Sequence, residues 1–281
     1  MAIVLGHNSY GKSEVRVLKV VRGAERHELR DLTVDVALTG EFAAAHLTGD
    51  NAGLLATDTM RNTVYALAKQ DPIDHLESFA RRLVEHFVAA GPTVSSARVR
   101  IVEHPWERVG DHPHAFQRGS GGQRVAVVSG DGREFSIEAG VDDLLVLKTT
   151  DSGWSGFLRE QYTTLLEADD RILATVITAL WRYSRVDAFD YTAVWQRVRA
   201  TILEAFGDHY SPSVQFTLRR IGEAVLEACA EIERIHLSLP NRHQLLFDLG
   251  RFGLANDNEI FHATTEPYGL IEGTVERVPD P

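Results

Sequence analysis

Hydrophobic and polar residues follow two different periods along the first half of the chain. Alternation of the two kinds predicts β-strands, whereas apolar residues spaced three or four apart predict helices. In chain order, the patterns predict strands at residues 15–21 and 32–38, helices at 57–69 and 73–90, and strands at 97–106 and 125–128. Gly91-Pro92 ends the second helix, because these residues commonly stop helices.

The second half predicts the same order of elements with one additional helix. Its patterns give strands at residues 134–139 and 144–149, helices at 168–181, 191–206 and 214–230, and strands at 233–239 and 244–249. Each half then forms an antiparallel sheet with helices on one face, which is an α+β arrangement. The turn sequence Gly130-Asp131-Gly132 predicts the join, so we expect a first unit at residues 1–131 and a second at 132–281.

The sheet face without helices also needs a cover, and a second copy of the chain is the simplest one. We therefore expect an oligomer. The formal net charge of -11 argues against nucleic acid as a partner, because phosphate binding needs a basic face. A small anionic substrate remains compatible with that charge, since a local Arg or Lys can outweigh it.

Cysteine use and hydropathy bear on the compartment. The single cysteine, Cys229, cannot form an intrachain disulfide and lies in an apolar helical pattern, where a buried position is expected. No apolar run approaches the ~20 residues of a membrane span, and Met1–Tyr10 lacks the pattern of a signal peptide. A cytoplasmic protein without a membrane partner is expected.

Several polar residues lie where binding chemistry is common, although each has an ordinary structural interpretation. Lys12 precedes the first strand, where a solvated lysine is usual. Thr57-Asp58 opens a predicted helix and suits either capping or an anion site. Arg171 follows Asp169-Asp170 near a predicted helix start, where it could form a salt bridge or grip a planar anion by two hydrogen bonds.

Further candidates occur in the second half. Val214-Gln215 begins the last long helix, and a glutamine there can read an amide-like edge. Asn241 and His243 lie between two strands, where the histidine could move protons near neutral pH. Trp154 lies in a glycine-flanked loop and could be a core residue or a stacking platform.

Cofactor motifs are missing from the sequence. The histidines at 104, 112 and 114 lack the spacing and the third ligand of a metal site. The glycine-rich nucleotide-binding motifs and the Gly-x-Ser-x-Gly motif of serine hydrolases do not occur. A metal site, a nucleotide cofactor and serine-hydrolase chemistry are therefore not expected from these motifs.

Taken together, short segments along nearly the whole chain resemble the urate oxidase family. They occur in the family's order and with similar gaps. The segments are Tyr10-Gly11-Lys12, Ala56-Thr57-Asp58 with Asn62-Thr63, Val146-Leu147-Lys148, Gly156-Phe157-Leu158, Tyr162-Thr163-Thr164-Leu165, Asp170-Arg171-Ile172-Leu173, Ser213-Val214-Gln215, Ser238-Leu239-Pro240-Asn241-Arg242-His243 and Gly269-Leu270-Ile271.

The resemblance implies a fold and a reaction. The fold would be two tandem T-fold units per chain, with sheets of several chains closing into a tunnel-like barrel in a homotetramer. Each active site would lie between two chains. Urate would be oxidised by dioxygen and water to 5-hydroxyisourate and hydrogen peroxide, as a step of purine degradation, with no metal or organic cofactor.

The resemblance also implies which residues hold the substrate. Arg171 and Gln215 would hold the amide edge of urate in the plane, and the backbone N–H of Val214 would bind one carbonyl oxygen. Asp58 of the neighbouring chain would contribute its backbone. Leu165 would line the pocket wall.

A second group of residues would carry the chemistry. Lys12, Thr57 and His243 would form a proton relay, with Lys12 and Thr57 contributed by different chains. Asn241 with Thr57 would make a polar niche for dioxygen and then water. A lysine that accepts a proton must first lose its charge, which desolvation or a neighbouring cation favours.

Trp154 is a departure from the family pattern. The family stacks a phenylalanine on the substrate, and counting back from Arg171 places Trp154 at that position, whereas Phe157 matches the next phenylalanine. We expect the indole of Trp154 to stack on urate, because it offers a larger π surface. Two alternatives stay open: a T-fold enzyme acting on a pterin or another purine, and a purine-binding scaffold without catalysis.

Overall fold

The computed structural model describes residues 1–186 and 189–278, and its internal contacts divide the chain into two compact units. The first unit contains Met1–Gly140 with Arg182–Ala193, and the second contains Val141–Trp181 with Val194–Pro281. Among the described residues, no helix is long and apolar enough to cross a lipid bilayer. The boundary expected at residue 131 lies in the turn that precedes the last strand of the first unit, and it stays a prediction.

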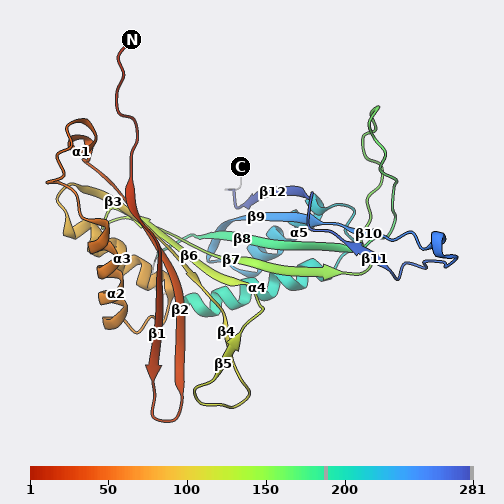
Figure 1. Cartoon of the computed structure of the whole chain (residues 1–281), viewed down its shortest axis with the longest axis horizontal. Coiled ribbons are helices and arrows are strands. Elements are labelled where there is room, and N and C mark those ends of the chain that lie inside the picture. Colours follow the sequence, from red (N-terminus) through yellow and green to blue (C-terminus); the bar gives the residue numbers. More distant parts are fainter. Residues whose placement is uncertain (187–188, 279–281) are drawn as a thin grey trace. The chain divides into compact units, whose positions relative to one another are not determined.

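The first unit is an antiparallel sheet with helices on one face (Figure 1). Its strands lie in the order β1-β2-β3-β6-β7. The elements are β1 (Tyr10–Arg22), β2 (His27–Gly40), α1 (Ala43–Leu47), α2 (Thr57–Gln70), α3 (Leu76–Ala90), β3 (Val94–Glu103), β6 (Gln123–Gly130) and the start of β7 (Phe135–Lys148). A short hairpin of β4 (Trp106–Arg108) and β5 (Phe116–Arg118) extends from it.

The core of this unit lies between the sheet and its two long helices. Met60 and Val64 of α2 pack against β1, and Phe79, Leu83 and Phe87 of α3 pack toward β3 and β6. These side chains are fully buried, as the helical spacing of their apolar residues predicts. The turn between β6 and β7 is held by Asp131, whose carboxylate accepts hydrogen bonds from two backbone N–H groups at 2.8 Å.

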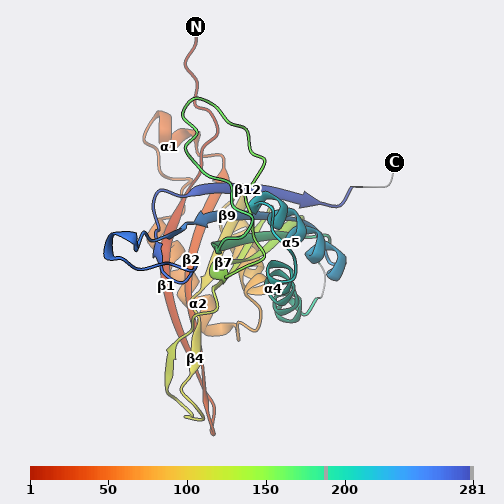
Figure 2. The same cartoon turned by 90° about the vertical axis from the view of Figure 1, so that its right-hand side faces the viewer.

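The second unit repeats this arrangement. Its strands lie in the order β7-β8-β9-β12, and two helices lie side by side against one face (Figure 2). The elements are β7, β8 (Leu173–Tyr183), α4 (Tyr191–Gly207), α5 (Val214–Ala228), β9 (Ile232–Arg242) and β12 (Gly269–Glu276). Between β9 and β12 lie β10 (Gln244–Leu246), the 3-10 turn η1 (Gly250–Phe252) and β11 (Phe261–Ala263). Cys229 is buried at the end of α5, as predicted.

Two predictions for the second half were wrong. Residues 168–181 do not form a helix, because most of this segment is strand β8, in which buried residues alternate with partly exposed ones from Thr175 onward. The β-branched run Thr175-Val176-Ile177-Thr178 favours a strand, and a buried sheet position outweighed the apparent helical spacing. The predicted strands 134–139 and 144–149 are one strand, β7. The predicted strand 244–249 was correct only for Gln244–Leu246, which pairs with β11 outside the main sheet, and the patterns did not predict β12, which completes that sheet. With these corrections, both halves have the same order of two strands, two long helices and two strands, and the α+β class is confirmed.

Candidate active site

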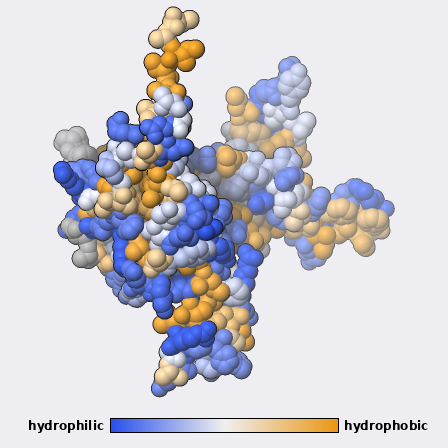
Figure 3. All heavy atoms as spheres, turned by 60° about the vertical axis from the view of Figure 1, so that its left-hand side comes forward, coloured by the Kyte–Doolittle hydropathy of each residue, from blue (hydrophilic) through white to orange (hydrophobic). Residues whose placement is uncertain are grey.

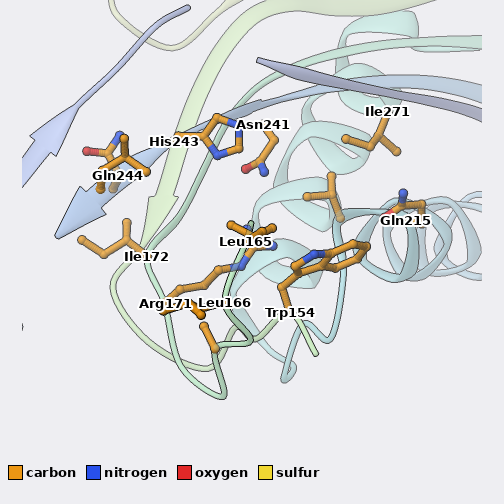
Figure 4. Close-up of a pocket in the computed structure, with 13 residues that line it drawn as sticks. Trp154, Leu165, Leu166, Arg171, Ile172, Gln215, Asn241, His243, Gln244 and Ile271 are labelled. Carbon is orange, nitrogen blue, oxygen red and sulfur yellow. The ribbon is translucent and has the colours of Figure 1, made fainter. Parts of the chain in front are cut away.

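A cavity of about 330 Å³ opens in the second unit, at the N-terminal end of α5 and the end of β9 (Figure 4). Most of the second-unit residues that the sequence singled out line this cavity. Its lining consists of Trp154, Leu165, Leu166, Ala168, Arg171, Ile172, Val214, Gln215, Asn241, His243, Gln244, Leu245 and Ile271. Figure 4 shows Arg171 and Trp154 approaching from one side and Asn241 and His243 from the other.

Arg171 is fixed by the loop that follows β7. Its backbone N–H donates to the carbonyl of Ser152 at 2.7 Å, and its Nε donates to the carbonyl of Gly153 at 3.3 Å. Burial lowers the pKa of the guanidinium below its ordinary value, although the group keeps its charge at neutral pH. Arg171 lies just before β8 and not near a helix start, so that part of the prediction was wrong. The arrangement presents a desolvated, fixed cation to the cavity.

A hydrogen bond from Tyr210 also holds this loop. Its hydroxyl donates to the carbonyl of Asp169 at 3.0 Å, two residues before Arg171. A Cβ atom at Gly153 would lie only 2.1 Å from that hydroxyl oxygen. Gly153 is therefore required by the close approach of Tyr210, and the two residues together determine the path of the chain between Trp154 and Arg171.

The indole of Trp154 is supported on one side. Its ring is parallel to that of Phe157, with 5.7 Å between centroids, and the guanidinium of Arg159 lies 5.2 Å from the centroid of Phe157. The backbone of Trp154 also exchanges two hydrogen bonds with Ala168, at 2.7 and 3.0 Å. Trp154 lines the cavity and Phe157 does not, which favours Trp154 as the stacking residue.

Helix α5 presents its first turn to the cavity. Ser213 is the N-cap, and its side-chain oxygen accepts a hydrogen bond from the N–H of Phe216 at 3.1 Å. Val214 and Gln215 are the first two helical residues, and N–H groups at these positions have no partner within a helix. The helix dipole adds positive potential at this end. This part of the cavity is thus suited to a carbonyl oxygen or an anion.

The end of β9 supplies two polar side chains. Asn241 is opposite Gly269 of β12, and Leu239 is opposite Ile271, so the late Gly269–Ile271 segment supports the strand that carries Asn241. His243 follows the strand, and its backbone carbonyl accepts a hydrogen bond from Thr264 at 2.9 Å. Both side chains line the cavity.

Lys12 belongs to the first unit, on the face of the sheet that the helices cover. It lies opposite Val36, whose side chain is 2% exposed beneath the helices. Directly opposite residues of antiparallel strands share a face. At the other end of the same strand face, Lys19 donates to the carbonyl of Ala68 at 2.8 Å, at the last turn of α2. Helix α2 is about 21 Å long. Since Lys19 lies at its last turn and Lys12 lies at the other end of the same strand, Lys12 lies toward the first turn of α2.

Thr57 and Asp58 form that first turn. The N-cap is Ala56, so the interpretation of Thr57 or Asp58 as the cap was wrong. The carboxylate of Asp58 accepts a hydrogen bond from Asn62 at 3.1 Å and pairs with Arg61 at 2.7 Å. The N–H of Leu55 donates to the hydroxyl of Tyr10 at 2.8 Å.

This contact joins the strand that carries Lys12 to the segment that leads into Thr57, within one unit of one chain. Lys12 and Thr57 therefore lie in the same unit of a single chain. Which chain supplies each of them to a shared site stays a prediction.

The predicted residues form two groups. Lys12, Thr57 and Asp58 belong to the first unit, whereas Trp154, Leu165, Arg171, Val214, Gln215, Asn241 and His243 line the cavity of the second. Sequence reasoning did not assign six of the lining residues to the site, and it missed the supporting Tyr210. The six are Leu166, Ala168, Ile172, Gln244, Leu245 and Ile271. Within residues 1–186 and 189–278, no group of three or more His, Cys, Asp or Glu side chains could hold a metal ion.

Comparison with known proteins adds to this geometry. A family model described as Uricase matches residues 8–129 and 137–272. The uricase of Arthrobacter globiformis is 47% identical over 275 residues, covering 98% of this chain and 90% of that protein. The uricase of Dictyostelium discoideum is 40% identical over 277 residues, covering 96% of each. A crystal structure of the Arthrobacter globiformis uricase is similar with a TM-score of 0.95 and 46% identity, covering 100% of this chain and 97% of that one.

Proposed function

Since this chain belongs to the uricase family and is a urate oxidase, we propose that it oxidises urate with dioxygen and water alone, at a site that two chains complete. The observation that carries this proposal is the single cavity that Trp154 lines together with Arg171, Gln215, Asn241 and His243. The reaction converts urate, O2 and H2O to 5-hydroxyisourate and H2O2. Two electrons leave the purine and reduce dioxygen to peroxide, and a hydroxyl group from water is added to carbon 5.

Arg171 and the first turn of α5 bind the substrate in this proposal. The guanidinium donates two parallel hydrogen bonds to one edge of the purine, and the amide of Gln215 both donates and accepts at the neighbouring edge. The N–H of Val214 binds a carbonyl oxygen, which the helix dipole favours. Trp154 stacks on the ring by the face that Phe157 leaves free, and Leu165 closes the wall. Holding a flat substrate in one orientation supplies several kcal/mol toward the reaction.

Proton transfer falls to Lys12, Thr57 and His243. An electron-rich urate dianion can reduce dioxygen directly, so the protein needs only to remove protons and hold the ring. The hydroxyl of Thr57 donates and accepts at once, and it can therefore pass a proton between Lys12 and His243. The location of Lys12 on the strand face toward the first turn of α2 supports this relay. Asn241 and Thr57 form the polar niche for dioxygen and then for water.

We propose that the first-unit group comes from one chain and the cavity group from its neighbour, in a homotetramer. Many large apolar side chains of the second unit are exposed in the single chain, which supports a partner that covers them. They include Leu145, Leu147, Leu158, Tyr162, Leu165, Leu166, Leu245, Leu246, Phe252 and Leu254. The N-terminal segment is also apolar and exposed, with Ile3 and Val4 on the surface (Figure 3).

Mixing two inactive variants tests the shared site. Chains with Lys12→Met and chains with Arg171→Ala are unfolded and refolded together at equal amounts. Each variant alone is inactive, and roughly a quarter of the sites in random mixed oligomers receive both intact residues from different chains. Recovery of that fraction supports the proposal, whereas no recovery in verified mixed oligomers refutes it. A mixture of Lys12→Met with Thr57→Ala is the matched control and stays inactive, because these residues come from one chain.

We also propose a cytoplasmic location. The single buried cysteine supports it, because the protein does not depend on an oxidising compartment. Fractionation of source cells with activity in the membrane or secreted fraction would contradict it.

A further inference from the structure

The direction in which Lys12 points depends on an irregularity in β1. In a regular strand, side chains alternate between faces, so residues three apart point to opposite sides. Lys12 and Val15 are three apart, yet they lie opposite Val36 and Val34, which both point toward the helices. One extra residue between Lys12 and Val15 shifts the register and forms a β-bulge. Without it, Lys12 would point to the other face of the sheet.

The bulge is strained and has a specific partner. Glu14 has a φ of 59°, in the left-handed region that side chains other than glycine rarely adopt. Its backbone N–H donates to Oδ1 of Asp35 on the neighbouring strand, at 2.8 Å. A carboxylate that accepts a backbone N–H forms a charge-assisted hydrogen bond, which is stronger than one between neutral groups. Asp35 therefore stabilises the conformation that turns Lys12 toward the helices.

The second unit contains a similar irregularity without the lysine, held by a carboxylate of its own strand. Residues 142–148 (Asp-Asp-Leu-Leu-Val-Leu-Lys) correspond to residues 13–19 (Ser-Glu-Val-Arg-Val-Leu-Lys). Asp143 has a φ of 55°, like Glu14, and its N–H donates to Oδ1 of Asp142 at 3.0 Å. The lysine that ends this segment, Lys148, donates to the carbonyl of His209 just beyond the first long helix, as Lys19 does at the end of α2.

Comparing the two units shows what distinguishes the position of Lys12. In the second unit, the equivalent residue is Val141, which is 1% exposed. Val141 and Leu144 are three residues apart and both are buried, so β7 also departs from strict alternation beside Asp143. The first unit has a charged amine where the second has a core valine. We infer that Asp35 is a positioning residue for catalysis: by holding the bulge at Glu14, it directs Lys12 toward the first turn of α2. This inference rests on the proposed role of Lys12.

Two substitutions of Asp35 separate geometry from charge. Asp35→Ala removes the acceptor, and displacing Lys12 by about 1 Å is expected to lower kcat about 10²-fold, with the KM for urate unchanged. Asp35→Asn keeps an oxygen that can accept from Glu14, and it should retain most of the activity. A loss in Asp35→Asn as large as that in Asp35→Ala would show that Asp35 does not act by accepting the hydrogen bond from Glu14.

The position of Lys12 can also be read without activity. The chain contains four lysines, Lys12, Lys19, Lys69 and Lys148, so lysine labelled with ¹³C at Cε gives few NMR signals, and Lys12→Met identifies the one from Lys12. The Lys12 signal should move in Asp35→Ala and stay in Asp35→Asn. The matched control is Asp142→Ala, which removes the carboxylate that accepts from Asp143 in the second unit and should leave the Lys12 signal in place. If Asp35→Ala does not fold, deletion of Ser13 removes the extra residue and should have the same effects.

The possible outcomes distinguish this inference from the proposed function. An unmoved Lys12 signal with wild-type kcat in Asp35→Ala overturns the role of Asp35. Full activity in Lys12→Met overturns the proposed role of Lys12, and the movement of the NMR signal in Asp35→Ala then decides the role of Asp35 in positioning by itself.

Discussion

Replacing Gly153 by alanine should displace the loop that holds Arg171 at the cavity. The added Cβ would lie 2.1 Å from the hydroxyl oxygen of Tyr210 and 3.1 Å from the carbonyl oxygens of Ala168 and Asp169. Tyr210 must then move and lose its 3.0 Å hydrogen bond to Asp169. Overpacking costs about 1–3 kcal/mol, and the lost hydrogen bond adds about 1 kcal/mol. We expect the free energy of unfolding to fall by about 2–4 kcal/mol.

The same displacement should reduce catalysis. Arg171 binds to the carbonyl of Gly153 and to that of Ser152 beside it, so movement of this loop moves the guanidinium. A shift of about 1 Å in a positioning group lowers the rate by about 10²-fold. The loss of the ultraviolet absorbance of urate gives kcat/KM, and thermal unfolding followed by circular dichroism gives the change in stability.

A second substitution makes this reasoning refutable. Tyr210→Phe removes the oxygen that the new methyl group would strike, so Gly153→Ala/Tyr210→Phe should be more active than Gly153→Ala alone. Tyr210→Phe by itself should lose about 1 kcal/mol of stability, the value of one hydrogen bond. Wild-type activity in Gly153→Ala, or no recovery in the double variant, would show that the contact with Tyr210 does not control the site.

Three further predictions concern binding and pH. Trp154→Ala should raise the Kd for urate, measured without oxygen, about tenfold through lost stacking, and an unchanged Kd would exclude stacking. Arg171→Lys should lower kcat/KM about 10²-fold, because an ammonium cannot make two parallel hydrogen bonds; a change under threefold would contradict this. Burial, and then repulsion by Arg16, lower the pKa of His104 below 6.5. The neutral imidazole therefore stabilises the fold at pH values above 6.5, and this stabilisation is lost as the pH falls through the lowered pKa. His104→Gln should therefore weaken the fall in Tm between about pH 7 and 5, and an identical fall would refute this.

Most elements of the fold follow from local patterns, and the exceptions have physical causes. The helices with Met60 and Phe79 on their apolar faces were predicted because one face of each is buried. Strand β8 was predicted as a helix because it is apolar nearly throughout, so its alternation is visible only as burial in the folded sheet. Strand β7 was predicted as two strands because Gly140 and Asp142-Asp143 interrupt its pattern, and Asp143 has the positive φ that such an irregularity requires.

The candidate site also contains residues that could be predicted from the sequence and contacts that could not. Arg171, Gln215 and Asn241 were recognisable because they occur in short motifs, and the structure gathers them at one cavity. The contact of Tyr210 with Gly153 and the hold of Asp35 on Glu14 were not predictable, because each joins residues far apart in the sequence. Such contacts depend on the folded sheet and leave no local pattern.

Mixing the metal-stripped protein with urate in air is the most direct test of the proposed chemistry. The ultraviolet absorbance of urate and the formation of hydrogen peroxide are followed together, after dialysis against a chelator and confirmation that the protein is folded. The proposal predicts continuous loss of urate with one peroxide formed for each urate consumed, at the same rate before and after metal removal. A folded protein that binds urate but oxidises it only after a metal or an organic cofactor is added would contradict it.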